Sequence, residues 1–571
     1  MNILAIHDGH NASACLMQNG KVIYLIQEER VVKEKNYDGF PHKAVALILE
    51  KTNLTIDDVD LVGLNGNYMP NPMNRMGIID YYKALAKGGT GWNIIKNRLK
   101  SIPFIAKPFE TQNKKKRTQR LIQMGFKESK IRFVEHHTCH ASAAYFGNAN
   151  FKDEILVLTN DGAGDRLCAT VSIAKEGKIK RIATTHENHS IGLLYASFTF
   201  LTGMVPLEHE YKLMGMAPYA DKKGAQKIAQ ALWEMFELDE QTLSWKFKAG
   251  YSIYSAVKHL KEFMYLKRFD HLMGGLQLFT EEFLVRWIKA AIKKTGIRKI
   301  ALAGGTFMNV KANKLIMELP EVETIYVMPS AGDESNPIGI AYYLEEENNG
   351  LKNLQPFTNI YWGVSFEDDT IKKAFEQYTF KSQYKITPYE NIEQKAAEIL
   401  AQGSVVARFK GNEEFGARSL GNRAILANPS KPDVIKEINE MIKNRDFWMP
   451  FASSVLDTDM DKYVVWDKNK NLPYYMIMTY DTQPIAHTEM AGGIHPYDKT
   501  VRPQMVSQDY NQEYWNLINH FKTITGIGGI LNTSLNLHGL PLVHSPEDAF
   551  HVMDNSSLKY LAIGNFLVEK V

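Results

Sequence analysis

Residues 131–144 have the sequence IRFVEHHTCHASAA. The first four residues predict a short strand, and the small residues that follow His140 are compatible with a helix. Comparable strand-like runs occur at residues 155–159, 299–303 and 324–328, with helical patterns at about residues 225–240 and 275–295. This mixture of strand and helix signals predicts the α/β fold class.

The N-terminus predicts a β-hairpin. Residues 2–7 and 21–26 form two strand-like runs, joined through a polar turn at residues 18–20 that ends in Asn19-Gly20. Between the runs lies the loop DGHNAS, residues 8–13. A polar loop that leaves an apolar strand is suited to presenting side chains to a ligand, although an ordinary turn explains the segment equally well.

Two histidines have the spacing of metal ligands. If residues 136–144 are helical, His136 and His140 lie at i and i+4 on one face. Asp161 and Asp333, in two acidic loops, are the candidates for further ligands. Imidazole with carboxylate suits iron, manganese or zinc, but the alternative is that these histidines only donate hydrogen bonds in a packed site. His137 replaces the glutamate of His-Glu-x-x-His, so a metalloprotease is disfavoured.

Glycine-rich loops follow two of the predicted strands. They are DGAGD at residues 161–165 and LAGGT at residues 302–306. Glycine at such positions lets backbone N–H groups approach a phosphate closely, but neither loop has the P-loop pattern. These features do not separate a nucleotide-dependent transferase from a sugar kinase or a metallohydrolase.

Composition excludes several classes. The 571 residues predict two to four domains, and 44% hydrophobic with 23% charged residues excludes a mainly disordered or fibrous chain. Three cysteines are too few for a disulfide framework. No apolar stretch approaches the ~20 residues of a membrane span, and the N-terminus lacks a leader pattern, so we expect a cytoplasmic protein with no membrane partner. A net charge of +3 gives no nucleic-acid signal.

A helical, basic segment interrupts the first half of the chain at residues 68–130. Its run Lys114-Lys115-Lys116-Arg117 is expected to be a solvated helix face. Loop composition at residues 348–356 places a domain boundary near residue 355, with strand and helix signals resuming at residues 360–362 and 391–401. We therefore predict two domains, 1–355 and 356–571.

Polar signals become dense beyond residue 400. They occur at residues 414–423, 443–445 and 532–536, where Arg and Lys alternate with Ser, Thr and Asn. Cations that offset phosphate charge, with hydroxyls and amides that fix orientation, suit a triphosphate pocket. By themselves these residues fit a solvated surface equally well.

Taken in order, these motifs resemble the O-carbamoyltransferase family of nodulation-factor and antibiotic tailoring enzymes. The matching segments are HNASA (10–14), HHxxHA (136–141), DGxG (161–164), KLMG (212–215), GGxxxN (304–309), FGxRxLG (415–421), PFA (450–452), RPQ (502–504) and LNTS (531–534). Each is weak alone, but nine in the family's order along the chain are specific.

The resemblance implies an N-terminal actin-like ATPase domain, similar to the tRNA threonylcarbamoyl-transfer enzyme, followed by a domain similar to threonylcarbamoyl-adenylate synthase. The synthase signature Lys-x-Arg with Ser-x-Asn is matched by residues 443–445 and 534–536. It further implies two reactions: carbamoyl phosphate and ATP, with Mg²⁺, give carbamoyl-adenylate, and the carbamoyl group then passes to a hydroxyl of a small-molecule or carbohydrate acceptor.

The resemblance also implies roles for individual residues. His10 and Asp8 are assigned to catalysis, and His136, His140, Asp333 and Asp161 to a divalent metal, with Fe²⁺ preferred over Mn²⁺ or Zn²⁺. The residues assigned to the nucleotide and carbamoyl phosphate are Lys35, Gly304, Gly305, Asn309, Arg418, Lys443, Arg445, Arg502, Asn532, Thr533, Ser534 and Asn536.

The sequence departs from the family pattern at Asn11, where Asp is usual, and at Met449, where Arg is usual. The second change removes a cation that Lys410 or Arg502 could replace. The alternative functions are tRNA modification by threonylcarbamoyl transfer, which the charge balance disfavours, and a non-catalytic nucleotide-binding regulator. A homodimer is the commonest assembly for such an enzyme.

Overall fold

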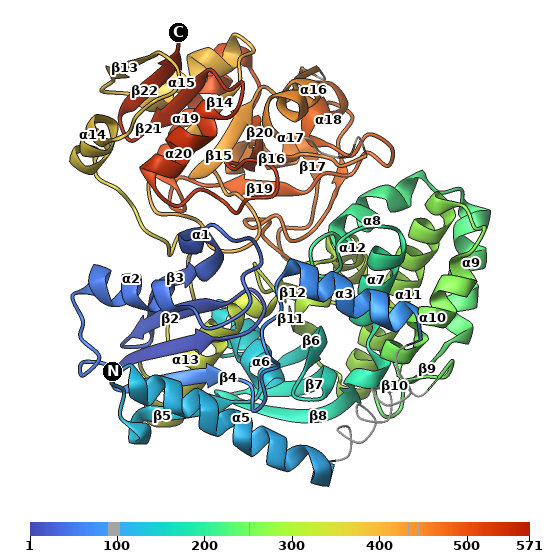
Figure 1. Ribbon diagram of the computed structural model, residues 1–571. Coiled ribbons are helices and arrows are strands. Elements are labelled where there is room, and N and C mark those ends of the chain that lie inside the picture. The colour runs from blue at the N-terminus through green and yellow to red at the C-terminus, as the bar shows by residue number, and fades with distance from the viewer. Residues whose placement is uncertain (89–102, 251, 432, 444–445, 447) are drawn as a thin grey trace. The chain divides into compact units, whose positions relative to one another are not determined.

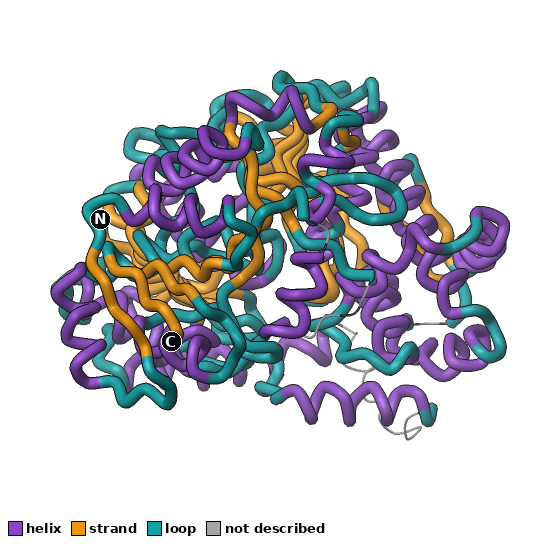
Figure 2. Tube along the Cα trace, turned by 90° about the horizontal axis from the view of Figure 1, so that it is seen from above, coloured by secondary structure: helices purple, strands orange, loops and turns teal. Residues whose placement is uncertain are grey.

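The chain forms two compact units in a computed structural model that describes residues 1–88, 103–250, 252–431, 433–443, 446 and 448–571 (Figure 1). Unit 1 comprises Met1–Glu28 and Asn36–Phe357, and unit 2 comprises Glu29–Lys35 and Thr358–Val571. Helices line the strands (Figure 2). This mixture confirms the predicted α/β class.

Unit 1 contains a first five-stranded sheet with the order β3-β2-β1-β4-β5. The strands are β1 (Asn2–His7), β2 (Ser13–Gln18), β3 (Lys21–Gln27), β4 (Leu61–Asn65) and β5 (Ile131–Val134). Strands β1, β2 and β3 pair antiparallel with one another, whereas β4 pairs in parallel with β1 and β5 in parallel with β4. Mixed sheets of this kind need helical crossovers for their parallel strands.

The predicted hairpin between residues 2–7 and 21–26 is wrong, because an additional strand, β2, separates them. The Asn19-Gly20 turn joins β2 to β3 instead, and both residues have the positive φ angles (48° and 77°) that a type I′ turn requires. Five of the six β2 residues are buried, so the strand lacks the polar–apolar alternation that marks a half-exposed strand.

A second five-stranded sheet in unit 1 repeats this arrangement, with the order β12-β11-β6-β7-β8. The strands are β6 (Ile155–Gly164), β7 (Leu167–Lys175), β8 (Lys178–His186), β11 (Lys299–Ala303) and β12 (Thr324–Val327). Again three antiparallel strands are followed by two parallel additions. Two sheets of identical order are the duplicated core of the actin-like fold, which confirms that prediction.

Two helices connect the sheets. Helix α13 (Asn336–Asn349) packs on β1 and β4, helix α6 (His136–Gly147) packs on β6 and β11, and the two helices pack on each other. At their crossing a Cβ on Gly339 would overlap the backbone of Cys139, so glycine permits this close approach. The N-terminal turn of α6 is thereby fixed between loops of both sheets.

The remaining helices of unit 1 cover the outer faces, and a short β9–β10 hairpin completes it. These elements are α1 (Glu28–Val32), which leads into unit 2, α2 (His42–Thr52), α3 (Arg75–Ala86), α5 (Pro103–Gln123), α7 (Ile191–Leu201), α8 (Glu210–Met216), α9 (Lys222–Glu234), α10 (Ile253–Met264), α11 (Phe269–Thr295), α12 (Val310–Glu318), β9 (Phe236–Asp239) and β10 (Ser244–Phe247). The helix predicted over residues 225–240 therefore ends at Glu234, where β9 follows.

The basic run at residues 114–117 is only partly the solvated face that we expected. Lys115 and Lys116 are exposed on α5, but Arg117 is 5% exposed. Its guanidinium pairs with Asp8 and also donates to the carbonyls of Asn65 and Gly66. The expectation for Arg117 is wrong because one helical turn places successive cations on opposite faces.

Unit 2 is built on an eight-stranded mixed sheet with the order β13-β22-β21-β14-β15-β20-β16-β19. The strands are β13 (Tyr384–Pro388), β14 (Val406–Phe409), β15 (Arg423–Ala427), β16 (Ala452–Leu456), β19 (Pro503–Val506), β20 (Gly529–Ser534), β21 (Tyr560–Ile563) and β22 (Phe566–Lys570), beside a short pair, β17 (Val464–Val465) and β18 (Asp481–Thr482). Residues 360–362, predicted as strand-like, are buried but irregular.

The helices of unit 2 are α14 (Asp368–Gln377), α15 (Ile392–Ala401), α16 (Asp433–Ile438), α17 (Met460–Tyr463), α18 (Ala486–Glu489), α19 (Gln512–Thr525) and α20 (Pro546–Asp554). Helices α15 and α19 pack together against the sheet, while residues of α14, α16 and α20 contribute to a separate apolar core cluster. None of the helices in the described ranges is both long and apolar enough to cross a membrane.

Residues 29–35 are an N-terminal excursion into unit 2. Arg30 is 4% exposed, and its guanidinium pairs with Glu413 at 2.8 Å and donates to the carbonyls of Glu414 and Gly416. Lys33 pairs with Asp548. Because the buried Glu413 also accepts from His544, the excursion completes a buried polar cluster of unit 2.

Candidate functional site

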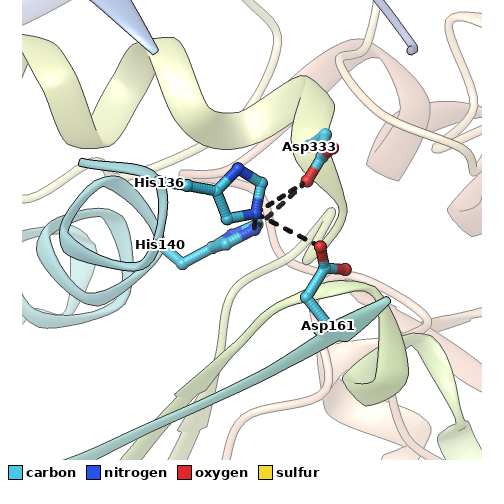
Figure 3. Close-up of side chains that lie close together, drawn as sticks. All are labelled: His136, His140, Asp161 and Asp333. Carbon is cyan, nitrogen blue, oxygen red and sulfur yellow. Dashed lines mark hydrogen bonds and ion pairs between the residues drawn. The ribbon is translucent and has the colours of Figure 1, made fainter. Parts of the chain in front are cut away.

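Four side chains converge in unit 1 at the end of α6 (Figure 3). The Nε2 atoms of His136 and His140 are 3.1 Å apart. Asp161 Oδ2 lies 3.2 Å from His136 Nε2, and Asp333 Oδ1 lies 3.2 Å from His140 Nε2 and 3.5 Å from His136 Nε2. All four ligand atoms lie within 4.8 Å of one another, so the structure brings the four predicted metal-binding residues together.

Local structure explains how these residues meet. His136 and His140 lie one turn apart on α6, whose first turn is capped by the carboxylate of Glu135. Asp161 belongs to β6, and its Oδ1 accepts the N–H of Gly305 at 2.8 Å, which leaves Oδ2 directed at His136. Asp333 follows β12 in a 3₁₀ turn that leads into α13.

The electrostatics of the cluster favour positive charge. Although burial opposes it, the Asp333 and Asp161 carboxylates raise the pKa of His136 to about 10. Burial likewise opposes ionisation of Asp333, but the neighbouring histidines, His136 first, lower its pKa well below the usual range. The carboxylates are thus held as anions around two imidazoles. A bound cation could take the place of the imidazole protons in this arrangement.

Two residues beside this cluster carried no sequence signal. His7, 1% exposed at the end of β1, contacts the His10 carbonyl through Nε2 at 2.8 Å and lies 3.9 Å from Asp333. Asn65, at the end of β4, donates from Nδ2 to His7 Nδ1 at 2.8 Å and lies 3.4 Å from His136 Nδ1. Burial lowers the pKa of His7, although the Asp333 carboxylate opposes this. In the sequence, His7 stands within an apolar strand pattern, which gives no reason to expect its contacts with Asn65 or Asp333.

The loop between β1 and β2 presents His10. Both ring nitrogens of His10 are buried, and neither has a hydrogen-bond partner among the described residues. The backbone of His10 bridges to Asp38, whose pKa is raised by burial although the Met73 N–H opposes this. Asp8, the other predicted catalytic residue, has both carboxylate oxygens engaged by Arg117.

The second glycine loop has a defined structural function. Gly304 has φ 102°, and a Cβ there would overlap the backbone of Asn160, so only glycine fits beside β6. Gly305 gives its N–H to Asp161. Asn309 caps α12 and exchanges two hydrogen bonds with Gln277, which accepts from Tyr195.

In unit 2 three residues of the predicted synthase signature, Lys443, Ser534 and Asn536, contact one another. Lys443 is 3% exposed, and its Nζ donates to the Ser534 carbonyl, to Ser534 Oγ at 3.1 Å and to Asn536 Oδ1 at 2.6 Å. Ser534 Oγ donates to the same Asn536 oxygen at 2.6 Å. Arg445, the other cation of the signature, lies outside the described residues.

The remaining nucleotide-binding residues predicted in unit 2 lie on β20 and in irregular segments. Asn532 is buried on β20 and donates to Ser454 on the adjacent β16 and to Gln504 on β19, the next strand. Thr533 is its buried neighbour, while Arg418, Arg502 and Lys35 are half-buried. Lys410, considered as a replacement for the cation missing at Met449, forms ion pairs with Glu393 and Glu513. Its charge is therefore already offset.

An actin-like unit with a buried histidine–carboxylate centre and a second unit with a buried lysine–serine–asparagine cluster define an α/β protein of two units, each with its own polar centre. Comparison with protein families agrees: a model of the carbamoyltransferase N-terminus matches residues 2–342, and a model of the carbamoyltransferase C-terminus matches residues 397–570. The chain belongs to the carbamoyltransferase family.

Individual relatives match along most of the chain. Nodulation protein NolNO of Sinorhizobium fredii is 28% identical over 98% of this chain and 79% of its own length. Uncharacterized protein MJ1058 of Methanocaldococcus jannaschii is 30% identical over 77% of this chain and 74% of its own length. The solved structure of T. kodakarensis HypF is 13% identical, covers 62% of this chain and 49% of its own, and has a TM-score of 0.34. At that TM-score the structural likeness carries no functional inference.

Proposed function

We propose that this protein is an ATP-dependent O-carbamoyltransferase that works in two steps. Unit 2 forms carbamoyl-adenylate from carbamoyl phosphate and ATP. One water is consumed in releasing phosphate from carbamoyl phosphate, and ATP releases pyrophosphate when the carbamate attacks it. Unit 1 transfers the carbamoyl group to a hydroxyl of a small-molecule or carbohydrate acceptor, and AMP leaves. The family supports carbamoyl transfer, and the convergence of His136, His140, Asp161 and Asp333 carries the assignment of the transfer site.

The four converging residues fit a divalent metal. Two imidazole nitrogens and two carboxylate oxygens form a donor set typical of Fe²⁺, Mn²⁺ or Zn²⁺, and we favour Fe²⁺. The backbone N–H of Gly305 orients Asp161, which is the kind of support that ligating carboxylates receive in metal sites. When bound, such a metal supplies Lewis-acid stabilisation of anionic oxygens.

The residues of unit 1 can perform the proton transfer. As the acceptor oxygen forms its bond to the carbamoyl carbon, the hydroxyl proton must be removed, and His10 offers ring nitrogens that no described residue occupies. His7 holds the His10 carbonyl, and Arg117 holds Asp8 two residues earlier. In this proposal Asp8 shapes the loop and His10 is the base.

The Lys443 cluster supports adenylate synthesis in unit 2. A buried ammonium beside hydroxyl and amide groups can offset phosphate charge, as the synthase signature requires. Conversion of carbamate to a mixed anhydride with AMP provides a leaving group that an alcohol can displace. Gly304, Gly305 and Asn309 are assigned to the nucleotide of the intermediate in unit 1.

The decisive experiment measures two reactions of the full-length protein. Exchange of labelled pyrophosphate into ATP that depends on carbamoyl phosphate reports adenylate synthesis, and metal analysis of wild type and His136→Ala reports the metal site. We expect exchange in the wild type and loss of bound metal in the variant. Absence of exchange contradicts adenylate synthesis, and equal metal content contradicts the metal assignment. Binding of tRNA at two salt concentrations tests the tRNA alternative.

A further inference from the structure

Unit 1 exposes a group of large apolar side chains beside the loop that carries His10. They are Tyr68 (39% exposed), Met73 (37%), Met76 (58%), Leu207 (39%) and Tyr211 (36%). We call these five side chains the apolar patch. Exposed apolar side chains that gather on one surface often mark a binding site, whereas scattered ones need no explanation.

The two segments of the patch are joined by an ion pair. Arg75, between Met73 and Met76, lies with its Nε 3.1 Å from Oε2 of Glu208, the neighbour of Leu207. Below this pair, α3 packs on α7 through Ile78 and Tyr82. The segments 68–76 and 207–211 therefore form one surface.

The patch is continuous with the candidate transfer site. Met73 donates its N–H to Asp38 Oδ2 at 2.9 Å, and Asp38 forms a backbone bridge with His10. Met69, in the same segment, packs so closely on Gly9 that a Cβ there would overlap its sulfur. Asp38 thus links His10, the proposed base, to the backbone of the apolar patch at Met73.

Hydrogen bonds fix the backbone under these side chains. Tyr68 N–H donates to Asp165 Oδ1 at 3.0 Å, and Met69 exchanges two hydrogen bonds with Asn113 of α5. Leu207 adopts a left-handed conformation (φ 64°) that is unfavourable for leucine, and its N–H donates to Glu210 at 2.6 Å. The structure therefore holds apolar side chains at the surface instead of burying them.

We propose that the apolar patch binds an apolar body of the acceptor while the acceptor hydroxyl reaches His10. This inference rests on the proposed function and narrows its substrate class to hydroxyl compounds with an aliphatic or aromatic portion. Continuity with His10 favours the acceptor as the occupant, and the charges of Arg75 and Glu208 offset each other, so the patch offers no attraction for a polyanion. Methionine side chains adapt their shape to such ligands.

The experiment compares two glucosides that differ only in their apolar part. Full-length protein labelled with ¹³C at the methionine methyl groups is titrated with hexyl β-D-glucoside, below its micelle-forming concentration, and with methyl β-D-glucoside. We expect the hexyl compound to shift the Met73 and Met76 resonances, assigned with Met73→Leu and Met76→Leu, and to bind at least about tenfold more tightly. That factor is what burial of about two methylene groups contributes.

Substitutions separate this surface from other apolar positions. Met73→Ser combined with Leu207→Ser should remove the preference for the hexyl compound, whereas Leu315→Ser, a 36% exposed leucine on α12, should preserve it. Equal affinity for both glucosides, or an unchanged preference in the double variant, overturns the inference. Pyrophosphate exchange measured on the same samples tests the proposed function separately. Exchange without a preference for the hexyl compound would therefore refute acceptor binding by the apolar patch and leave the proposed function standing.

Discussion

Arg117 and Asp8 form a buried bidentate ion pair across 109 residues of sequence, with Nε to Oδ2 at 2.8 Å and Nη2 to Oδ1 at 2.6 Å. The same guanidinium donates to the carbonyls of Asn65, the last residue of β4, and of Gly66, which follows it. Helix α5 is thereby fastened to the loop that presents His10. A segment whose composition indicates a solvated insertion thus contributes a residue that positions the candidate site.

We predict that Arg117→Met will destabilise unit 1 by roughly 3–5 kcal/mol, because it leaves Asp8 as an unpaired buried charge. Denaturant unfolding measures this loss. Lys115→Met, on the exposed side of the same helix, is the control and should change stability by less than about 0.5 kcal/mol. Equal stability of the Arg117→Met variant and the wild type would show that the pair contributes nothing.

The sequence predicts the four candidate metal ligands but misses the two polar residues beside them, and the difference has a physical reason. His136 and His140 could be predicted because helical periodicity alone brings them to one face. Asp161 and Asp333 could be predicted because each lies in an acidic segment after a predicted strand, although Asp161 itself proves to belong to β6. His7 and Asn65 could not, since their partners are 58 to 71 residues apart. Only the parallel pairing of β1 with β4 places them together, and no local pattern encodes that pairing.

We predict a specific acid response from Glu413. Burial opposes its ionisation, but Arg30 and then His544 lower its pKa to about 2. The pKa of Glu413 in the folded protein lies below the usual value near 4.5. Its carboxylate therefore makes its full contribution to the free energy of unfolding above about pH 4.5. That stability, roughly 3 kcal/mol, is lost as the pH falls toward 2. In Arg30→Met the pKa of Glu413 rises, so unit 2 should be less stable at neutral pH and lose less on acidification.

Urea unfolding of the full-length protein between pH 3 and pH 7 checks this response. Lys33→Met is the matched control, because Lys33 lies in the same excursion but its side chain is 62% exposed. Its ion pair with Asp548 should contribute at most about 1 kcal/mol. Parallel stability curves for Arg30→Met and the wild type would contradict the assignment of the pKa shift to Arg30.

We predict that Lys443→Ala will abolish adenylate formation and leave transfer from preformed carbamoyl-adenylate largely intact. The substitution removes the buried ammonium that contacts Ser534 and Asn536 in unit 2, whereas the proposed transfer site lies in unit 1. Pyrophosphate exchange and transfer are measured separately, with the exposed Lys436→Ala as control. The resemblance predicts the same for Arg445→Ala. Equal loss of both half-reactions would count against two distinct sites.

The sequence predicts that the loop at residues 8–13 is polar, but it does not predict the conformation of that loop. Asn11 replaces the usual family Asp and has φ 60°, a left-handed conformation that Asn tolerates well. The loop was recognisable as polar, but the β-strand that follows it was not, because β2 is almost wholly buried. The backbone bridge from His10 to Asp38 joins residues 28 positions apart, so this geometry required the tertiary structure.

We predict that His10→Asn, which keeps a polar side chain but removes the base, will slow carbamoyl transfer. Both His10 ring nitrogens are buried and lack a hydrogen-bond partner among the described residues, so no described group competes with a substrate hydroxyl for them. Positioned general-base catalysis contributes ~10²- to 10⁴-fold, and we expect carbamoyl transfer to slow by that factor. Adenylate synthesis in unit 2 should be nearly unchanged.

Single-turnover transfer from saturating carbamoyl-adenylate decides between a base and a binding residue. If His10 only hydrogen-bonds the adenylate phosphate, its loss weakens binding of the intermediate, and saturation restores the wild-type rate. If His10 accepts the hydroxyl proton, the rate stays low at saturation, because no concentration of the intermediate replaces the missing base. Recovery of the wild-type rate would therefore remove His10 from the role of base, whatever its effect at low concentrations.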